Sequence, residues 1–135
     1  MRSILAAFSL ALSIHAAEAA NRYSGRYSGA CGDLACELDV TPAGPDRWTV
    51  RWTATDPADP ADHSLRVLCD FRTTVELGSA VLGPAGVVDG VAVGRHHGRP
   101  FALFDLDPGR VSWSSSWEAC PGIRPKAIYT AFGDQ

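Results

Sequence analysis

Apolar and polar residues alternate along several segments of this chain, and this pattern constrains its fold more than any other feature. Residues 47–54, 64–71 and 110–117 each place apolar side chains at every second position. Because successive side chains of a β-strand point to opposite faces, the alternation predicts strands with one buried face. After residue 19, no segment carries an apolar stripe with the period of a helix. We therefore predict an all-β protein.

Residues typical of turns separate these segments at short intervals. Proline, glycine and aspartate gather at 42–46, 56–62, 83–86, 89–90, 96–100 and 107–109, and further strands are predicted at 36–41, 101–106 and 126–132. Short connections favour antiparallel neighbours, and a sheet with this many strands must close or split. We expect a small antiparallel meander β-barrel of about eight strands. The strand containing Tyr23 and Tyr27 would pair with the strand containing Tyr129 and hide both edges.

The first 19 residues have the layout of a secretory signal peptide. Met1-Arg2-Ser3 supplies positive charge, residues 4–14 are apolar, and Ala17-Glu18-Ala19 is a small-x-small cleavage site. The apolar run is shorter than the roughly 20 residues that span a bilayer, so we expect no membrane span. Of the 135 residues, 135 − 19 = 116 would remain as a single β-barrel domain, residues 20–135, that is secreted or periplasmic.

The chain has four cysteines, Cys31, Cys36, Cys69 and Cys120, and an even number in a small exported domain predicts two disulfides. Cys31 and Cys36 flank a tight connection, which favours pairing them with each other and Cys69 with Cys120. The pairing of Cys31 with Cys120 and Cys36 with Cys69 stays open. No C-x-x-C motif is present and the C-x4-C spacing has no matching second pair, so neither a redox nor a metal site is expected, and no cofactor.

The charge balance argues against a nucleic-acid partner. Lysine and arginine number 12 against 15 aspartates and glutamates, for a formal net charge of −3. Binding to phosphate backbones requires a clustered basic surface, so an acidic charge balance does not favour nucleic acid as the main partner.

Gly25-Arg26-Tyr27, at the start of the first predicted strand, is similar to the G-x-W or G-x-Y opening of lipocalin- and avidin-like barrels. This resemblance covers three residues and implies ligand binding in a barrel mouth or lumen. The layout of a small exported β-barrel with disulfides also resembles periplasmic inhibitors of lysozymes and proteases.

Two pairs of tryptophans are the first candidate binding residues. Trp48 and Trp52 share one face of a predicted strand, as do Trp113 and Trp117. Tryptophans in such positions can stack on sugar rings or line a ligand cavity. The alternative is that they fill the barrel interior, as the parity they share with neighbouring valines favours.

The segment 120–125 is the second candidate, because a disulfide at Cys120 and two prolines would make it rigid. It carries Ile123, which we expect to be exposed, and Arg124. A rigid loop suits protein recognition because it loses little entropy on binding. The alternative is a purely structural crossover.

Signals for catalysis are weak. No G-x-S-x-G motif is present, His96 and His97 are expected to be solvated loop residues, and Asp105, Asp107 and Glu118 are the carboxylates considered for hydrolysis. We therefore expect a non-enzymatic exported binding protein that recognises a protein or cell-envelope component through loops at one barrel end, in an inhibitor-like manner. The alternatives are a calycin-like carrier of a small apolar ligand and a carboxylate-dependent hydrolase.

Overall fold

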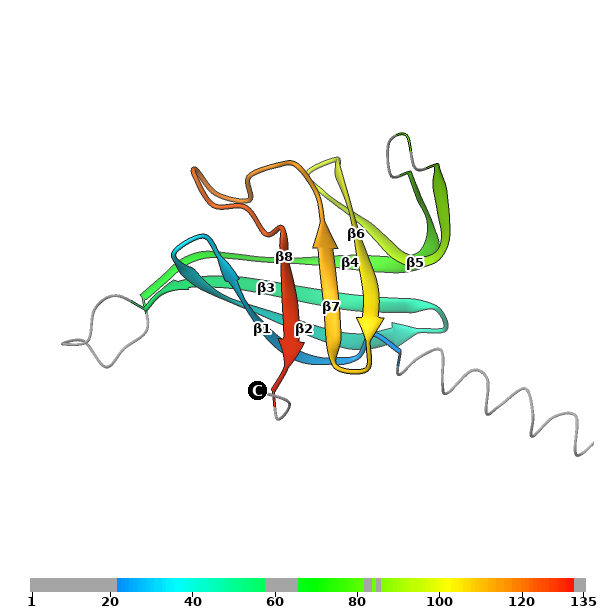
Figure 1. Cartoon of the computed structure of the whole chain (residues 1–135), viewed down its shortest axis with the longest axis horizontal. Helices are drawn as coiled ribbons and strands as arrows, with labels where there is room; N and C mark the ends of the chain where they lie inside the picture. The colour runs from blue at the N-terminus through cyan, green and yellow to red at the C-terminus, as the bar shows by residue number, and fades with distance from the viewer. Residues whose placement is uncertain (1–21, 58–65, 82–83, 85, 133–135) are drawn as a thin grey trace, which may run out of the picture.

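The computed structural model describes residues 22–57, 66–81, 84 and 86–132, which form a closed barrel of eight antiparallel strands in chain order (Figure 1). The strands are β1 (Gly25–Cys31), β2 (Leu34–Gly44), β3 (Arg47–Asp56), β4 (Arg66–Val81), β5 (Val87–His96), β6 (Arg99–Asp107), β7 (Arg110–Ser114) and β8 (Ala127–Ala131). This confirms the meander barrel. The predicted signal peptide, residues 1–19, lies outside the described residues. Within them, no helix has the length and apolar character needed to cross a membrane.

The first and last strands close the barrel. β1 pairs with β8 through Tyr27 opposite Ala131 and Ser28 opposite Thr130. Tyr23 precedes β1 rather than lying in it. Its ring is fully buried and meets Trp48 edge-on, with 5.1 Å between the ring centroids.

Several strand ends differ from the predicted ones; β2, for example, continues through Pro42 to Gly44, which were predicted to lie in a turn. β4 continues to Val81, and Asp89 and Gly90, predicted to break the chain, lie within β5. β7 ends at Ser114, opposite Ala102 of β6, rather than at Trp117; continuing the register by two more pairs would place Ser116 opposite Pro100. Proline has no N–H to donate to a neighbouring strand.

The inward face of the barrel is filled with large side chains. Trp48, Val50, Trp52 and Ala54 of β3 are all fully buried, and Trp113 of β7 is 1% exposed. Phe101 stacks on Trp113 with 4.2 Å between the ring centroids. This packing favours the interpretation of these three tryptophans as interior residues.

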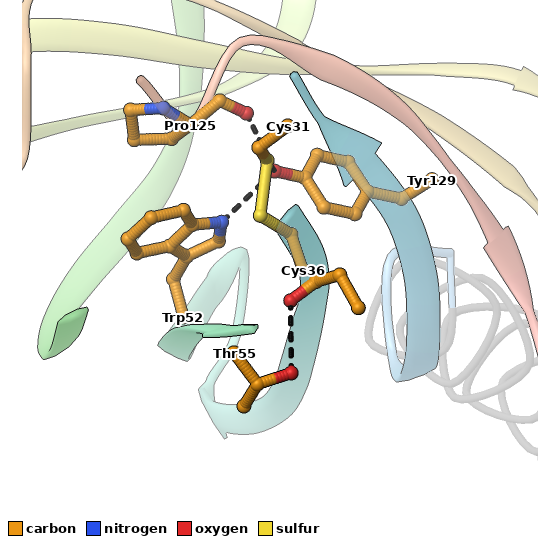
Figure 2. The surroundings of a disulfide bond; sticks show 7 residues. Cys31, Cys36, Trp52, Thr55, Pro125 and Tyr129 are labelled. Atoms are coloured by element: carbon orange, nitrogen blue, oxygen red, sulfur yellow. Dashed lines mark hydrogen bonds between the residues drawn. A yellow bond between two sulfur atoms is a disulfide. The ribbon is translucent and has the colours of Figure 1, made fainter. Parts of the chain in front are cut away.

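The hydroxyl group of Tyr129 joins three parts of the barrel (Figure 2). It accepts a hydrogen bond from the indole N–H of Trp52 at 2.9 Å and donates one to the carbonyl of Pro125 at 2.5 Å. It also lies 3.4 Å from the Sγ of Cys31. Burial raises the pKa of Tyr129 well above its ordinary value, so the hydroxyl remains protonated and can donate.

Two disulfides, Cys31–Cys36 and Cys69–Cys120, confirm the favoured pairing, and each joins Cα atoms 6.0 Å apart.

In a meander barrel, alternate connections lie at the same end. The β1–β2 turn, the β5–β6 turn and the β7–β8 connection (residues 115–126) therefore share one end, which carries both disulfides. We call it the pinned end. Because disulfides persist in oxidising compartments, the two bonds indicate an extracellular or periplasmic type of environment.

Substitution Tyr129→Phe should lower the free energy of unfolding by about 2–4 kcal/mol, because it leaves the buried Trp52 N–H and Pro125 carbonyl without partners. Urea unfolding with the disulfides intact measures the change. Tyr23→Phe is the matched control, since the Tyr23 hydroxyl is buried with no hydrogen bond of good geometry among the described residues. It should cost less than about 1 kcal/mol. Equal losses in the two variants would contradict the role given to Tyr129.

Removing the Cys69–Cys120 bond by a double substitution to alanine should destabilise the protein more than removing Cys31–Cys36. The first bond spans 51 residues and the second spans 5. By loop-closure entropy the costs are at most about 4 and 2 kcal/mol, respectively. Thermal unfolding of the two variants tests this order, and the reverse order would contradict it.

Candidate functional site

The β7–β8 connection is held against the barrel at several points. Cys120 binds it covalently to Cys69 of β4. Near Cys120 the chain makes a tight turn, in which the N–H of Ile123 donates to the carbonyl of Cys120 at 2.9 Å and the N–H of Ala119 donates to the carbonyl of Ile123 at 2.8 Å. Further along, Pro125 is buried. The connection is therefore preorganised before any partner binds.

The sequence Pro121-Gly122 explains this tight turn. Gly122 has a φ of 77°, a conformation that glycine adopts without steric cost. Proline at the second position and a glycine with positive φ at the third are typical of a type II turn. Pro121 and Gly122 are exposed at its tip, together with Arg124 just beyond it.

Trp117 lies over the same end of the barrel. Its indole N–H donates to the carbonyl of Pro100 at 2.7 Å. The guanidinium group of Arg99 lies 4.6 Å from the Trp117 ring centroid, which is cation–π geometry. Arg99 also donates to the carbonyl of Glu118 at 2.7 Å and so links the β5–β6 turn to the connection.

His96 packs against the side chains that surround Trp117. Its ring stacks on Phe71 with 4.0 Å between the centroids and lies 5.8 Å from the ring of Trp117. Burial lowers the pKa of His96 below its ordinary 6.5, and the neighbouring His97 and Arg99 act in the same direction. His96 is thus the last residue of β5 and half-buried, not the solvated loop residue predicted from sequence, whereas His97 is exposed in the turn.

The six predicted binding residues separate into two groups. Trp48, Trp52 and Trp113 lie in the interior, and Trp117, Ile123 and Arg124 lie together in the β7–β8 connection. Trp117 does not continue the strand of Trp113; the chain turns, and the two rings are 6.2 Å apart. Ile123 is half-buried against the core rather than exposed, because the Pro-Gly turn directs the chain back onto the barrel. Arg124 is exposed over 61% of its side chain.

Sequence reasoning missed Arg99 and Phe71 as parts of this site. The alternation assigned Phe71 an inward position but did not indicate that it supports His96. Arg99 lies directly after the turn residues His97 and Gly98, and only the folded chain brings it against Trp117.

The carboxylates considered for hydrolysis are dispersed. Asp105, near the other end of β6, forms a two-point ion pair with Arg22 at 2.7 and 3.0 Å, and Asp107 pairs with Arg110 at 2.9 Å. Glu118 lies at the pinned end, 3.9 Å from Arg124. The structure thus does not bring Asp105 and Glu118 together. Among the described residues, no group of three or more histidine, cysteine or acidic side chains has the arrangement of a metal site.

Comparisons with protein-family models, with curated proteins and with solved structures found no significant match to this chain.

Stability should fall as the pH drops from about 7.5 to 5.5, in part because of His96. The folded state holds the pKa of His96 below 6.5, so the unfolded chain binds a proton more readily as the pH falls through that value. His96→Gln, which stays neutral, should show a smaller loss of stability over this interval. His97→Gln, which removes only a secondary cause of the His96 shift, should reduce the loss less than His96→Gln does. Urea midpoints at the two pH values provide the measurement, and an unchanged loss in His96→Gln would refute the assignment.

Proposed function

We propose that this protein is an exported, non-enzymatic binding protein that recognises another protein or a cell-envelope component through the pinned end. The observation that carries the proposal is the position of Trp117 near the surface. Of the four tryptophans, it alone lies near the surface, in a connection held by a disulfide, a Pro-Gly turn and Arg99.

The residue types at the pinned end support a macromolecular partner. Tryptophan and arginine are the residues that most often dominate binding energy at protein interfaces. Trp117, Arg99 and Arg124 lie within one short stretch of surface, and half-buried Ile123 adds apolar area beside them. Because the connection is already ordered, binding costs little conformational entropy.

An inhibitor-like mode follows from the same rigidity. A turn whose tip exposes Pro121 and Gly122, with Arg124 beside it, can enter a concave site on a partner without refolding. The placement of both disulfides at this end supports that mode, since they restrict the surrounding chain.

The interior packing favours this proposal over an apolar-ligand carrier. Trp48, Trp52 and Trp113 are each at most 1% exposed and contact other ring systems or core side chains. A ligand in the lumen would have to displace them. The ion pairs of Asp105 and Asp107 with arginines likewise favour binding over hydrolysis.

Affinity capture with the mature protein, residues 20–135, tests the proposal. Immobilised parent protein should retain a partner from periplasmic or envelope extract, and the substitution Arg124→Glu should weaken that binding about tenfold or more, as expected for an interface arginine. Arg110→Glu is the matched control, because Arg110 is a surface arginine at the opposite end of the barrel. If both variants bind like the parent, or both lose binding equally, the pinned end is not the recognition surface.

A further inference from the structure

A two-stranded arm extends beyond the barrel wall. The β3–β4 ladder ends with Arg47 opposite Glu76, and the β5–β6 ladder ends with Ala92 opposite Leu103. Residues 78–81 and 87–91 therefore pair only with each other. We call these two segments the arm, and Figure 1 shows it turned away from the direction of the other strands.

Glycines permit the sharp bend at the base of the arm. The register shifts between Gly78 and Ser79, and Gly90 on the opposite strand has a φ of 73°, as expected for a bulge that contains glycine. A Cβ atom at Gly78 would lie only 2.9 Å from the Cγ2 of Val93. The arm therefore bends toward the side of the sheet on which Val93 lies.

The bend creates a groove of about 1140 Å³ on this side of the barrel. Arm residues Ser79 to Val81 line one side, and Pro100 of β6 with Ser114 to Ser116 line the other. Val93 and Ala102, which are paired across β5 and β6, lie in its floor. Arg95 and Lys126 also line it.

The outward face of β6 is unusual for a barrel strand. Pro100, Ala102, Phe104 and Leu106 are all apolar on that face, whereas Phe101 and Leu103 occupy the inward face. Strands that are apolar on both sides are typical of sheets covered on both sides. Ala102 is only 5% exposed although it lies outside the core cluster, so the groove walls already cover part of this face.

The groove is also positively charged, although the whole chain is acidic with a net charge of −3. Glu76, its acidic lining residue, is already paired with Arg47 at 2.8 Å. Arg95 and Lys126 have no carboxylate within ion-pair distance among the described residues; Arg95 donates only to the carbonyl of Gly98. Their charges are available to a ligand.

The arm indicates that the ligand is a polypeptide. On the side of β5 away from β4, the main chain of residues 87–91 has no strand partner in the described structure. An extended peptide can satisfy such N–H and carbonyl groups by adding a strand, which a lipid or a sugar cannot do.

We propose that this groove binds an extended, acidic segment of a partner protein. Its carboxylates meet Arg95 and Lys126, and its apolar side chains lie on Val93 and Ala102. Where the segment leaves the groove, its main chain pairs with the free edge of residues 87–91, which lie outside the groove lining and continue along β5 into Val93. The proposal uses residues other than Trp117, Ile123 and Arg124, so it stands independently of the recognition surface at the pinned end.

Fluorescence anisotropy with a labelled ten-residue peptide of alternating glutamate and valine tests the proposal on the mature protein. The acidic peptide should bind, and a peptide of alternating lysine and valine should not. Arg95→Glu combined with Lys126→Glu should weaken binding at least about tenfold, because two attractive pairs become repulsive. Amide hydrogen exchange in residues 87–91 should slow when the acidic peptide is bound.

Arg66→Glu combined with Arg72→Glu is the matched control, since it makes the same change in charge on β4 outside the groove. This control should bind the acidic peptide within about twofold of the parent. Equal weakening in both double variants, equal binding of the two peptides, or no binding at all would each overturn the proposal. Binding to anionic lipid vesicles but not to the acidic peptide would also overturn it, and circular dichroism verifies that each variant is folded.

Discussion

The hydrogen bonds of the Tyr129 hydroxyl are the interaction on which the rest of this structure depends. Within the part of the chain that the structure describes, β1 and β8 share two residue pairs, so the main-chain ladder alone gives a short closure. Tyr129 adds bonds to Trp52 on β3 and to Pro125 at the end of the β7–β8 connection, and it contacts the Cys31–Cys36 disulfide. One buried phenol thus couples barrel closure to the position of the pinned end. Buried polar groups of this kind are stabilising only while every partner is present.

Because the interior of the barrel is filled, both proposed binding surfaces lie on its outside. The lumen holds aromatic rings and aliphatic side chains. The two surfaces are the β7–β8 connection at the pinned end and the groove beside the arm. These two surfaces meet at Ser114 to Ser116, where β7 ends and the chain turns toward Trp117. The β6–β7 ladder stops at Ala102, and the carbonyl of Pro100 receives the indole N–H of Trp117. Pro100 therefore contributes to both surfaces, since it lines the groove and its carbonyl holds the Trp117 ring.

Much of the fold could be predicted because its signals are local. The alternation in residues 47–54 placed Trp48 and Trp52 on one face, and the short spacing of Cys31 and Cys36 favoured their disulfide. Predictions that depended on distant neighbours were less accurate. Trp117 continued the alternation of β7, but the ladder it would have joined ends at Ala102 of β6, opposite Ser114. Ile123 was expected to be exposed, yet the turn at Gly122 returns it to the core.

The sequence by itself determined the strands, their inward faces, the meander order and the preferred disulfides, since each follows from residues close together in the chain. Only the tertiary structure decided which exposed side chains lie close together. Arg99 reaches Trp117, and Arg95 and Lys126 line the same groove, only after the barrel closes and the arm bends. The physical reason is that these placements depend on strand register and on the curvature at Gly78 and Gly90. Both arise from long-range pairing, which no short segment of sequence encodes.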